Sequence, residues 1–455
     1  MLVTKFMYTS ILTLHILTVQ GQVPVSVEPK PFQFDVYPDK VVKFNTGQVN
    51  NPSASIMATY NIPPAGASSE EQRRYAEKDI RRYDMQIAQK QKLIDDANGA
   101  LEAVHIDYEF PFSDLPEKNL YFDAFNYLKK VLNGDEPINL EAAVFFVEHA
   151  YNPSLNYNEF SKLLGNGANV IGLKMQQDKI SPDDNIGKIM TTFRFLSDTL
   201  KVYSKSTETT ITTYPKTYDF EDFWGRKDYN KMFVSKLMKE GSGQCHSLPL
   251  YFLLLCERIN ADASLAFAPN HSFIKFKDKR GNWHNLELTN AMLTSDHFMV
   301  ESGYIKAEAI QNRIYLEALT KKQTIVQCLN DLASGYIKKY GYDSFVKACT
   351  ELAIENDMNS LSAHQINANY YMMLDSYIKY QYEKKGISKE AYQQDEKAKS
   401  ISDSATGANK FIERLGYTDM PQDVYEAWLK SAQTEANKQQ HKKEVKVLGG
   451  MIEIK

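Results

Sequence analysis

Residues 241 to 249 read Gly241-Ser242-Gly243-Gln244-Cys245-His246-Ser247-Leu248-Pro249, and the apolar run Leu250–Ile259 follows directly. Proline suits the first turn of a helix, because the N–H that it lacks has no helical partner there. The stretch therefore predicts a helix over the apolar run, with Cys245 at its amino end behind a glycine-rich approach. Tyr229–Glu240 predicts another helix just before the glycines.

The pattern changes after Asn260, where apolar and polar residues begin to alternate. This alternation predicts strands at Ser264–Ala268, His271–Phe276 and Trp283–Leu288. The polar segment Asp278–Asn282 predicts the hairpin connection between the last two strands. Helices followed by a small antiparallel sheet indicate the α+β class.

The predicted hairpin brings a histidine and an acid together. With the hairpin centred on Lys279, His271 lies directly opposite Glu287, about 5 Å away at Cβ. Asn285 then opposes Phe273 and stands diagonal to His271. A bulge in the connection would shift this register by one residue and separate the pair.

These residues fit the requirements of thiol catalysis, which needs a thiolate, a neighbouring imidazole and a group that orients the imidazole. A helix amino end stabilises the Cys245 thiolate, and its N–H groups suit a developing oxyanion. The candidate triad is Cys245, His271 and Glu287. Gln244, as a further oxyanion donor, and Asn285 are the supporting side chains.

Plainer interpretations of each residue stay open. A cysteine that opens an apolar helix is most often simply buried, and a lone strand histidine is most often structural. His246 is a competing base, although it should point elsewhere on the helix, and His284 is expected at the surface. No cluster has metal-ligand spacing, so we expect neither a metal nor a cofactor.

The amino terminus indicates export. Lys5 precedes an apolar stretch, Phe6–Val19, and the small residues Val19 and Gly21 suit a cleavage site. Residues 1–21 are therefore predicted to be a signal peptide, which places the mature chain in the periplasm or outside the cell. The stretch is too short and interrupted for a good membrane span, although an uncleaved anchor is the alternative. We expect no transmembrane span in the mature chain.

Two segments precede the predicted thiol domain. Residues 22–66, rich in Pro, Val and Asn, predict an extended arm. Residues 67–104 predict a long helix, because Ser68 and Glu71 form a capping box and an apolar residue recurs every seven positions. That apolar stripe favours packing on the helix's own domain over a coiled-coil seam.

The thiol domain is expected over residues 105–306, and its first part has mainly helical periodicity. Within that part, Gly165-Asn166-Gly167 is interpreted as a turn between two helices. Residues 307–455 predict a further helical domain. There the pair Ala333 and Tyr336 recurs as Ala368 and Tyr371, a shift of 35 positions, which suggests tetratricopeptide-like hairpins. An irregular helical bundle fits the same pattern equally well.

Charge and cysteine usage exclude several classes of function. The formal net charge of −4 gives no electrostatic basis for binding nucleic acid. Cys245 and Cys256 would lie about 16 Å apart on one helix, beyond disulfide reach. We expect all four cysteines to be free thiols, which argues against a disulfide scaffold.

The chain resembles the bacterial transglutaminase-like superfamily of papain-type thiol proteins, in the branch with tetratricopeptide-like helices after the core. The matching motifs are Asp228-Tyr229-Asn230, Gly243-Gln244-Cys245-His246-Ser247-Leu248-Pro249, Ala268-Pro269-Asn270-His271-Ser272-Phe273 and Leu286-Glu287-Leu288-Thr289. The resemblance covers roughly residues 140–289. It implies a papain-like core with the catalytic order Cys245, His271 and acid. That acid is commonly Asp in the family, so Glu287 is a departure that keeps the charge on a longer arm.

The predicted function is an exported cysteine hydrolase or acyltransferase that acts on a peptide or amide bond of a peptide or protein substrate. The alternative is a catalytically silent scaffold whose C-terminal helices bind a peptide or an envelope protein. The two differ in whether Cys245 is needed for function.

Overall fold

The computed structural model describes residues 105–223, 225–302, 304–421 and 423–428, together with positions 68, 70, 73–74, 77–78, 81, 84–92, 430–431, 434 and 438. The predicted signal peptide (1–21) and arm (22–66) lie outside the described residues. In the predicted helix over 67–104, every described position from 70 to 92 is helical and exposed.

Contacts divide the chain into two compact units. One holds the described residues of 108–380 and 388–438, and the other holds those of 29–107 and 381–387. The domain boundaries expected from the sequence stay predictions. Everything described below concerns the first unit.

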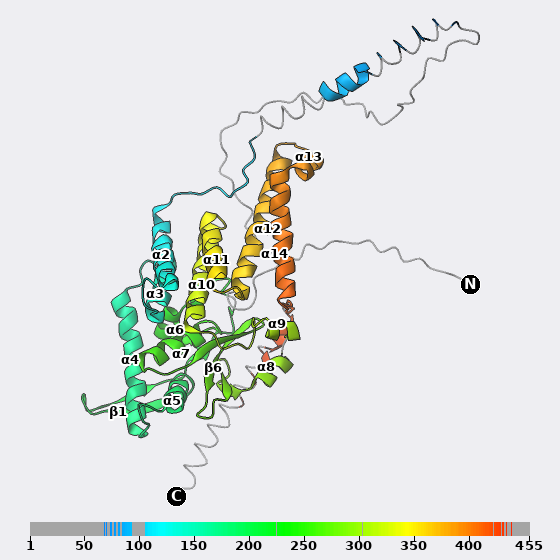
Figure 1. Cartoon of the computed structure of the whole chain (residues 1–455). Coiled ribbons are helices and arrows are strands. Elements are labelled where there is room, and N and C mark those ends of the chain that lie inside the picture. The colour runs from blue at the N-terminus through cyan, green and yellow to red at the C-terminus, as the bar shows by residue number, and fades with distance from the viewer. Residues whose placement is uncertain are drawn as a thin grey trace, which may run out of the picture. The chain divides into compact units, whose positions relative to one another are not determined.

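The first unit combines many helices with small sheets, which confirms the predicted α+β class (Figure 1). Its first half carries η1 (Pro116–Lys118), α2 (Asn119–Asn133), α3 (Leu140–Tyr151), α4 (Tyr157–Gln177), α5 (Asn185–Ser197), η2 (Tyr229–Met232), α6 (Val234–Glu240) and α7 (Ser247–Arg258). The second half carries α8 (Asp296–Ser302), α9 (Ala307–Gln311), α10 (Lys321–Tyr340), α11 (Ser344–Asn356), α12 (Leu361–Lys384), α13 (Lys389–Gln394) and α14 (Glu396–Arg414). No helix of the described part has an apolar stretch that would cross a bilayer.

Helix α7 is the centre of the unit. Its residues from Ser247 to Cys256 are all buried, as expected for a helix that is apolar on every side. It packs against α4, α5 and α6 and against strands β5 (Ser264–Ala268) and β6 (His271–Lys277). The amino end of α7 therefore lies where helices meet the sheet.

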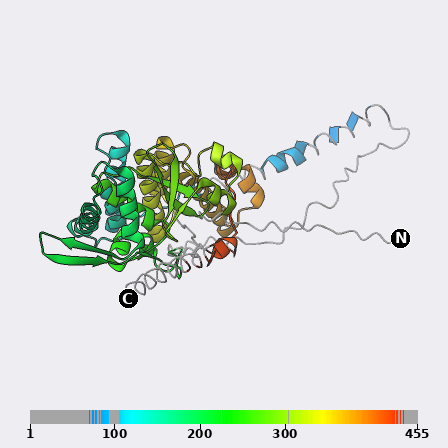
Figure 2. The same ribbon diagram turned by 90° about the horizontal axis from the view of Figure 1, so that it is seen from below.

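The main sheet is antiparallel, in the order β5-β6-β7-β8, with β7 at Trp283–Glu287 and β8 at Met292–Thr294. Its first three strands confirm the predicted strands almost residue for residue. Five strands lack a counterpart in the sequence interpretation: β8, the β1–β2 hairpin (Leu200–Ser204 and Thr209–Thr213) and the parallel pair β3–β4 (Thr217–Tyr218 and Ser242–Gly243). Figure 2 shows the β1–β2 hairpin projecting beyond the helices that it follows.

The register of the β6–β7 hairpin differs from the predicted one by two residues. Lys275 pairs with Asn285 and Ile274 with Leu286, so the hairpin is centred on Arg280 rather than Lys279. The Asp278 N–H donates to the Asn282 carbonyl, which closes a three-residue connection with Gly281 in the left-handed region. A shift of two residues keeps every side chain on its face, so His271 and Glu287 still share one side of the sheet.

Two helical predictions were wrong in detail. Gly165 and Gly167 lie inside α4, not in a turn. At Gly167, α7 crosses close beside α4, and a Cβ there would lie 2.9 Å from the Tyr251 hydroxyl. The predicted helix Tyr229–Glu240 is divided into η2 and α6 by Phe233, which has extended backbone angles.

Candidate active site

The Cys245 turn is fixed by the side chain of Ser247. The Ser247 hydroxyl accepts the Gln244 N–H at 2.9 Å, and the Leu248 N–H reaches the Gln244 carbonyl at 3.0 Å. A Cβ on Gly243 would lie 2.7 Å from the Ser247 oxygen, so only glycine leaves room for this hydroxyl. Cys245 is thereby placed two residues before α7, at the amino end predicted from the sequence.

His271 is the first residue of β6 and follows a tight turn. Asn270 has a left-handed backbone (φ 57°), which asparagine tolerates well, and it joins β5 to β6 with Pro269. This turn brings the Asn270 carbonyl to 4.0 Å from the Cys245 sulfur, within reach of a weak hydrogen bond from the thiol. Ser272 donates to the Cys245 carbonyl at 2.5 Å. The two catalytic candidates are thus held together by their neighbours in the chain.

Glu287 orients the His271 ring. Its Oε2 lies 2.5 Å from His271 Nε2, and its Oε1 accepts the Thr289 N–H at 2.8 Å. With Nε2 engaged by the acid, Nδ1 is the ring nitrogen left for the thiol. It is buried and has no hydrogen bond of regular geometry among the described residues. A loose thiol–imidazole contact is usual in an unliganded site.

Charge around the thiol favours the ion pair. Burial raises the pKa of Cys245, but hydrogen bonding and charge from His271, with a smaller contribution from His246, outweigh it and lower the pKa below the ordinary thiol value. Burial lowers the pKa of His271, yet the Glu287 carboxylate and the thiol raise it to about 10. Both shifts stabilise a thiolate beside an imidazolium.

Gln244 and Asn285 do not lie as the sequence suggested. The Gln244 amide donates to the Asp219 and Asp222 carbonyls, at 3.1 and 3.2 Å, so its donor is directed away from an oxyanion position. Asn285 opposes Lys275 rather than Phe273, and its amide donates to Asp296 at 2.9 Å. Both side chains support the scaffold around the triad instead of facing the sulfur.

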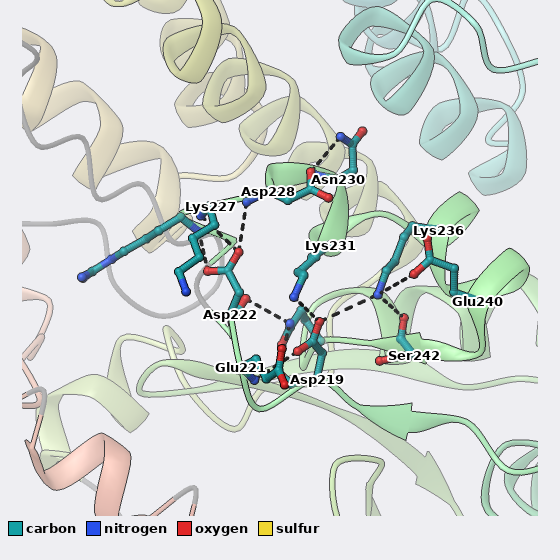
Figure 3. A network of polar contacts seen from close by, with 12 residues as sticks. Asp219, Glu221, Asp222, Lys227, Asp228, Asn230, Lys231, Lys236, Glu240 and Ser242 are labelled. Atoms are coloured by element: carbon teal, nitrogen blue, oxygen red, sulfur yellow. Dashed lines mark hydrogen bonds and ion pairs between the residues drawn. The ribbon is translucent and has the colours of Figure 1, made fainter.

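Figure 3 shows the loop that holds the Gln244 amide. The Asp222 carboxylate accepts the N–H groups of Arg226, Lys227 and Asp228 at 2.9 to 3.1 Å. Asp219 pairs with Lys231 at 2.7 Å. These contacts explain why a surface loop beside the active-site turn is well fixed.

The remaining histidines near the site have separate partners. His246 Nε2 lies 3.1 Å from Asp331 on α10, in a pair whose two side chains are 8% and 9% exposed. His284 faces Asp278 at 3.1 Å near the surface. Each ring is therefore directed at its own carboxylate and not at the Cys245 sulfur, as expected.

Sequence reasoning missed three aromatic residues at the site. Tyr218 pairs with Gly243 across β3 and β4, two residues before Cys245, and burial, Tyr425 and the Cys245 thiol raise its pKa. Tyr425 is buried and stacks on Trp428, whose ring lies 4.8 Å from the His271 ring, centroid to centroid. No signal marks them, because Tyr425 and Trp428 are far from Cys245 in sequence and have no motif around them.

The described residues contain no group of three or more His, Cys, Asp or Glu side chains that could hold a metal ion. All four cysteines are free and buried, which confirms the predicted absence of disulfides. No protein-family model matches the chain, and neither a curated protein nor a solved structure is found to be similar to it.

Proposed function

We propose that this chain is a transglutaminase-like cysteine acyl-transfer enzyme with a papain-like core, and that Cys245, His271 and Glu287 are its triad. The observation that carries the proposal is the 2.5 Å contact between His271 Nε2 and Glu287 Oε2, beside a thiol at the amino end of α7. The order of these residues in the chain also follows the family resemblance.

The geometry supports the following chemistry. The Cys245 thiolate attacks the carbonyl carbon of an amide, a C–S bond forms, and the C–N bond breaks as His271 gives its proton to the leaving amine. Water or a second amine then attacks the thioester and gives a proton to His271, which releases the thiolate. N–H groups at the start of α7 suit the transient oxyanion. Water as acceptor gives hydrolysis, and an amine gives crosslinking.

Alkylation by iodoacetamide at neutral pH tests the activated thiol. We expect Cys245 to be alkylated in the unchanged chain, and His271→Ala to slow this reaction, because the thiolate loses its main stabilising partner. Cys256 is the internal control, because burial raises its pKa and it has no histidine partner. Labelling of Cys245 at the same rate in both proteins would rule out activation by His271.

A fluorescent primary amine offered with a mixture of peptides then separates the two reactions. Covalent incorporation of the amine indicates crosslinking, whereas shortened peptides indicate hydrolysis. Cys245→Ala is the control for both, since neither product should form without the nucleophile.

A silent scaffold is the second candidate, and the burial of the dyad favours it: Cys245 is 8% exposed and His271 is 2% exposed. In that case the C-terminal helices bind a peptide or an envelope protein. Cys245→Ala should then leave partner binding and phenotype intact. A variant that binds its partner but no longer acts decides for the enzyme.

We also propose that the chain is exported. The support is the apolar stretch Phe6–Val19 after Lys5. Amino-terminal sequencing of the secreted or periplasmic protein should begin just after Gly21. A mature protein that retains residues 1–21 would contradict cleavage at this position.

A further inference from the structure

A segment near the end of the described chain lies over the proposed catalytic residues. We call residues 417–421 and 423–428 the C-terminal cap. The cap follows α14, and its helical residues 423–428 bring Tyr425 and Trp428, one helical turn apart, onto the site. Tyr425 is 1% exposed, although Asp423 and Ala427 of the same short helix are exposed.

The cap is attached firmly at its beginning. Gly416 has φ 93°, and a Cβ there would lie 2.3 Å from the Ala309 nitrogen of α9, so backbone packs on backbone at this point. The Asn312 amide holds the carbonyls of Arg414 and Leu415 at 3.2 and 3.3 Å. The attachment fixes where the cap starts.

Aromatic contacts hold the cap on the site. Trp428 meets the His271 ring edge to face at 4.8 Å, and Tyr425 lies 5.9 Å from Trp428 and 5.5 Å from Phe223, all between ring centroids. Phe223 follows Asp222, whose carboxylate holds the loop by accepting the Arg226 N–H. The cap thus rests on the ring of His271 and on the ring of Phe223.

These contacts fill the space that a substrate needs. An amide carbonyl must approach the Cys245 sulfur while its nitrogen stays within reach of His271. Trp428 covers the imidazole, and Tyr425, which stacks on Trp428, is buried with it. A substrate cannot occupy the same volume, so the cap and an acyl donor exclude each other.

We propose that the C-terminal cap is an autoinhibitory plug, which must swing away about its attachment at Gly416 before a peptide or amide substrate reaches Cys245. This inference rests on the proposed function, since it concerns access to the same thiol. The closed arrangement is the major state, and the open state is a minor one that substrate or a partner selects. Tyr417 and Met420 are buried near the attachment, whereas the helical part of the cap contacts the site through two ring side chains on one helical turn. Such a small contact suits reversible opening of the helical part.

The test compares Cys245 alkylation by iodoacetamide in the full chain and in its Tyr425→Ala/Trp428→Ala variant. In the unchanged chain a minor open state is typically populated at about 0.1–10%, whereas in the double variant it becomes the dominant state. We therefore expect the rate of Cys245 alkylation to rise at least about tenfold. Trp283→Ala is the matched control, because Trp283 lies on β7 and is 46% exposed. Its rate should equal that of the unchanged chain. A synthetic peptide of residues 417–434, added to the double variant, should slow the reaction again.

The outcomes separate the plug from the proposed function. Equal rates in the double variant and the unchanged chain overturn the plug, whatever the thiol chemistry. A rise with an ordinary thiol pH profile supports the plug and counts against the activated triad. A rise in the alkylation rate, with Cys245 still reacting at pH values well below the ordinary thiol pKa, supports both the plug and the activated triad. Labelling of Cys256, Cys328 or Cys349 reveals misfolding, and Trp428→Leu alone then replaces the double variant under the same criteria.

Discussion

At Glu287, one buried carboxylate has two tasks that use different oxygens. Oε2 meets the His271 ring and Oε1 holds the Thr289 N–H, so the carboxylate cannot rotate without losing a backbone contact. The side chain is 1% exposed, which keeps water from competing for the imidazole. The longer arm of Glu, compared with the Asp common in the resembling family, spans a diagonal rather than a directly opposed position.

Replacing Glu287 by Gln should slow the alkylation of Cys245. The amide can still meet the ring, but it no longer offsets the burial that lowers the pKa of His271. The imidazolium is then lost near neutral pH, and the thiolate with it. Each pKa unit changes the thiolate fraction about tenfold, so we expect at least about a tenfold loss of rate at pH 7. Glu287→Asp is the control that keeps the charge, and it should retain more of the rate than Glu287→Gln. Equal losses in both variants would mean that charge is not the cause.

The pH profile of Cys245 provides a second check at this scale. Its lowered pKa means that the thiolate persists below the ordinary thiol value and disappears only as pH falls through the lowered pKa. Alkylation rates measured from pH 5 to pH 10 should therefore reach their plateau earlier than those of a peptide cysteine. His271→Ala should move the inflection upward, because burial and the Glu287 charge, which both raise the pKa of Cys245, are then opposed only by the smaller contribution of His246. An inflection at the ordinary thiol pKa in the unchanged chain would contradict the ion pair.

At the scale of elements, Glu148 of α3 forms the amino-terminal cap of α6. Its carboxylate accepts the N–H groups of Val234 and Ser235 at 2.6 and 2.9 Å, which are first-turn donors without helical partners. Even so, burial dominates and raises its pKa to about 7. The carboxyl group therefore binds a proton more tightly in the folded protein than in the unfolded chain.

This shift predicts a loss of stability with rising pH. Between about pH 4.5 and pH 7 the folded state holds the Glu148 proton and the unfolded state does not, so the free energy of unfolding falls as pH rises through that window. The pKa difference corresponds to about 3 kcal/mol. Urea unfolding at pH 5 and pH 7.5 should show this decrease in the unchanged chain and a smaller one in Glu148→Gln. The same pH dependence in both proteins would assign the decrease to other groups.

Sequence patterns predicted the elements that have a clear hydrophobic periodicity or a residue that marks where the element begins. The strands β5, β6 and β7 alternate over five residues or more, and Pro249 marks the start of α7. The pairs β1–β2 and β3–β4 lack such a signal: the exposed β2 is largely threonine, and β3 and β4 have two residues each. Gly165 and Gly167 misled the prediction, because both are helical despite their low helix propensity, and at Gly167 the close approach of α7 favours a residue without a side chain.

The candidate site was predictable only in part, for a related reason. The face of a strand on which a side chain lies follows from the alternation of residues along that strand. Cys245, His271 and Glu287 could therefore be grouped from the sequence. The register depends on how Asp278 and Gly281 shape the turn, and it was wrong by two residues. Contacts between distant segments, such as Trp428 on His271 or Asp331 with His246, have no local signature at all.

At the scale of the whole molecule, α10 connects the C-terminal helices to the proposed catalytic region. It packs on α2, α3 and α11 and supplies Asp331 to His246, next to Cys245 (Figure 1). A buried ion pair at 3.0 Å joins Lys118 to Asp343 at the start of α11. Loss of one member of such a pair leaves a buried charge without a partner, so removal of either residue should destabilise the unit.

This architecture predicts that the unit unfolds as a single cooperative structure, although a domain boundary near residue 306 was expected from the sequence. Cys256 on α7, Cys328 on α10 and Cys349 on α11 are buried reporters on both sides of that boundary. Pulse alkylation at increasing urea concentrations should expose all three at the same midpoint, as in a two-state transition. Lys118→Met should lower the three midpoints together. We expect the free energy of unfolding to fall by about 3–5 kcal/mol, the usual cost of removing one partner of a buried ion pair. If Cys328 and Cys349 became reactive at lower urea than Cys256, the helices after residue 306 would instead be a separate domain docked on the thiol core.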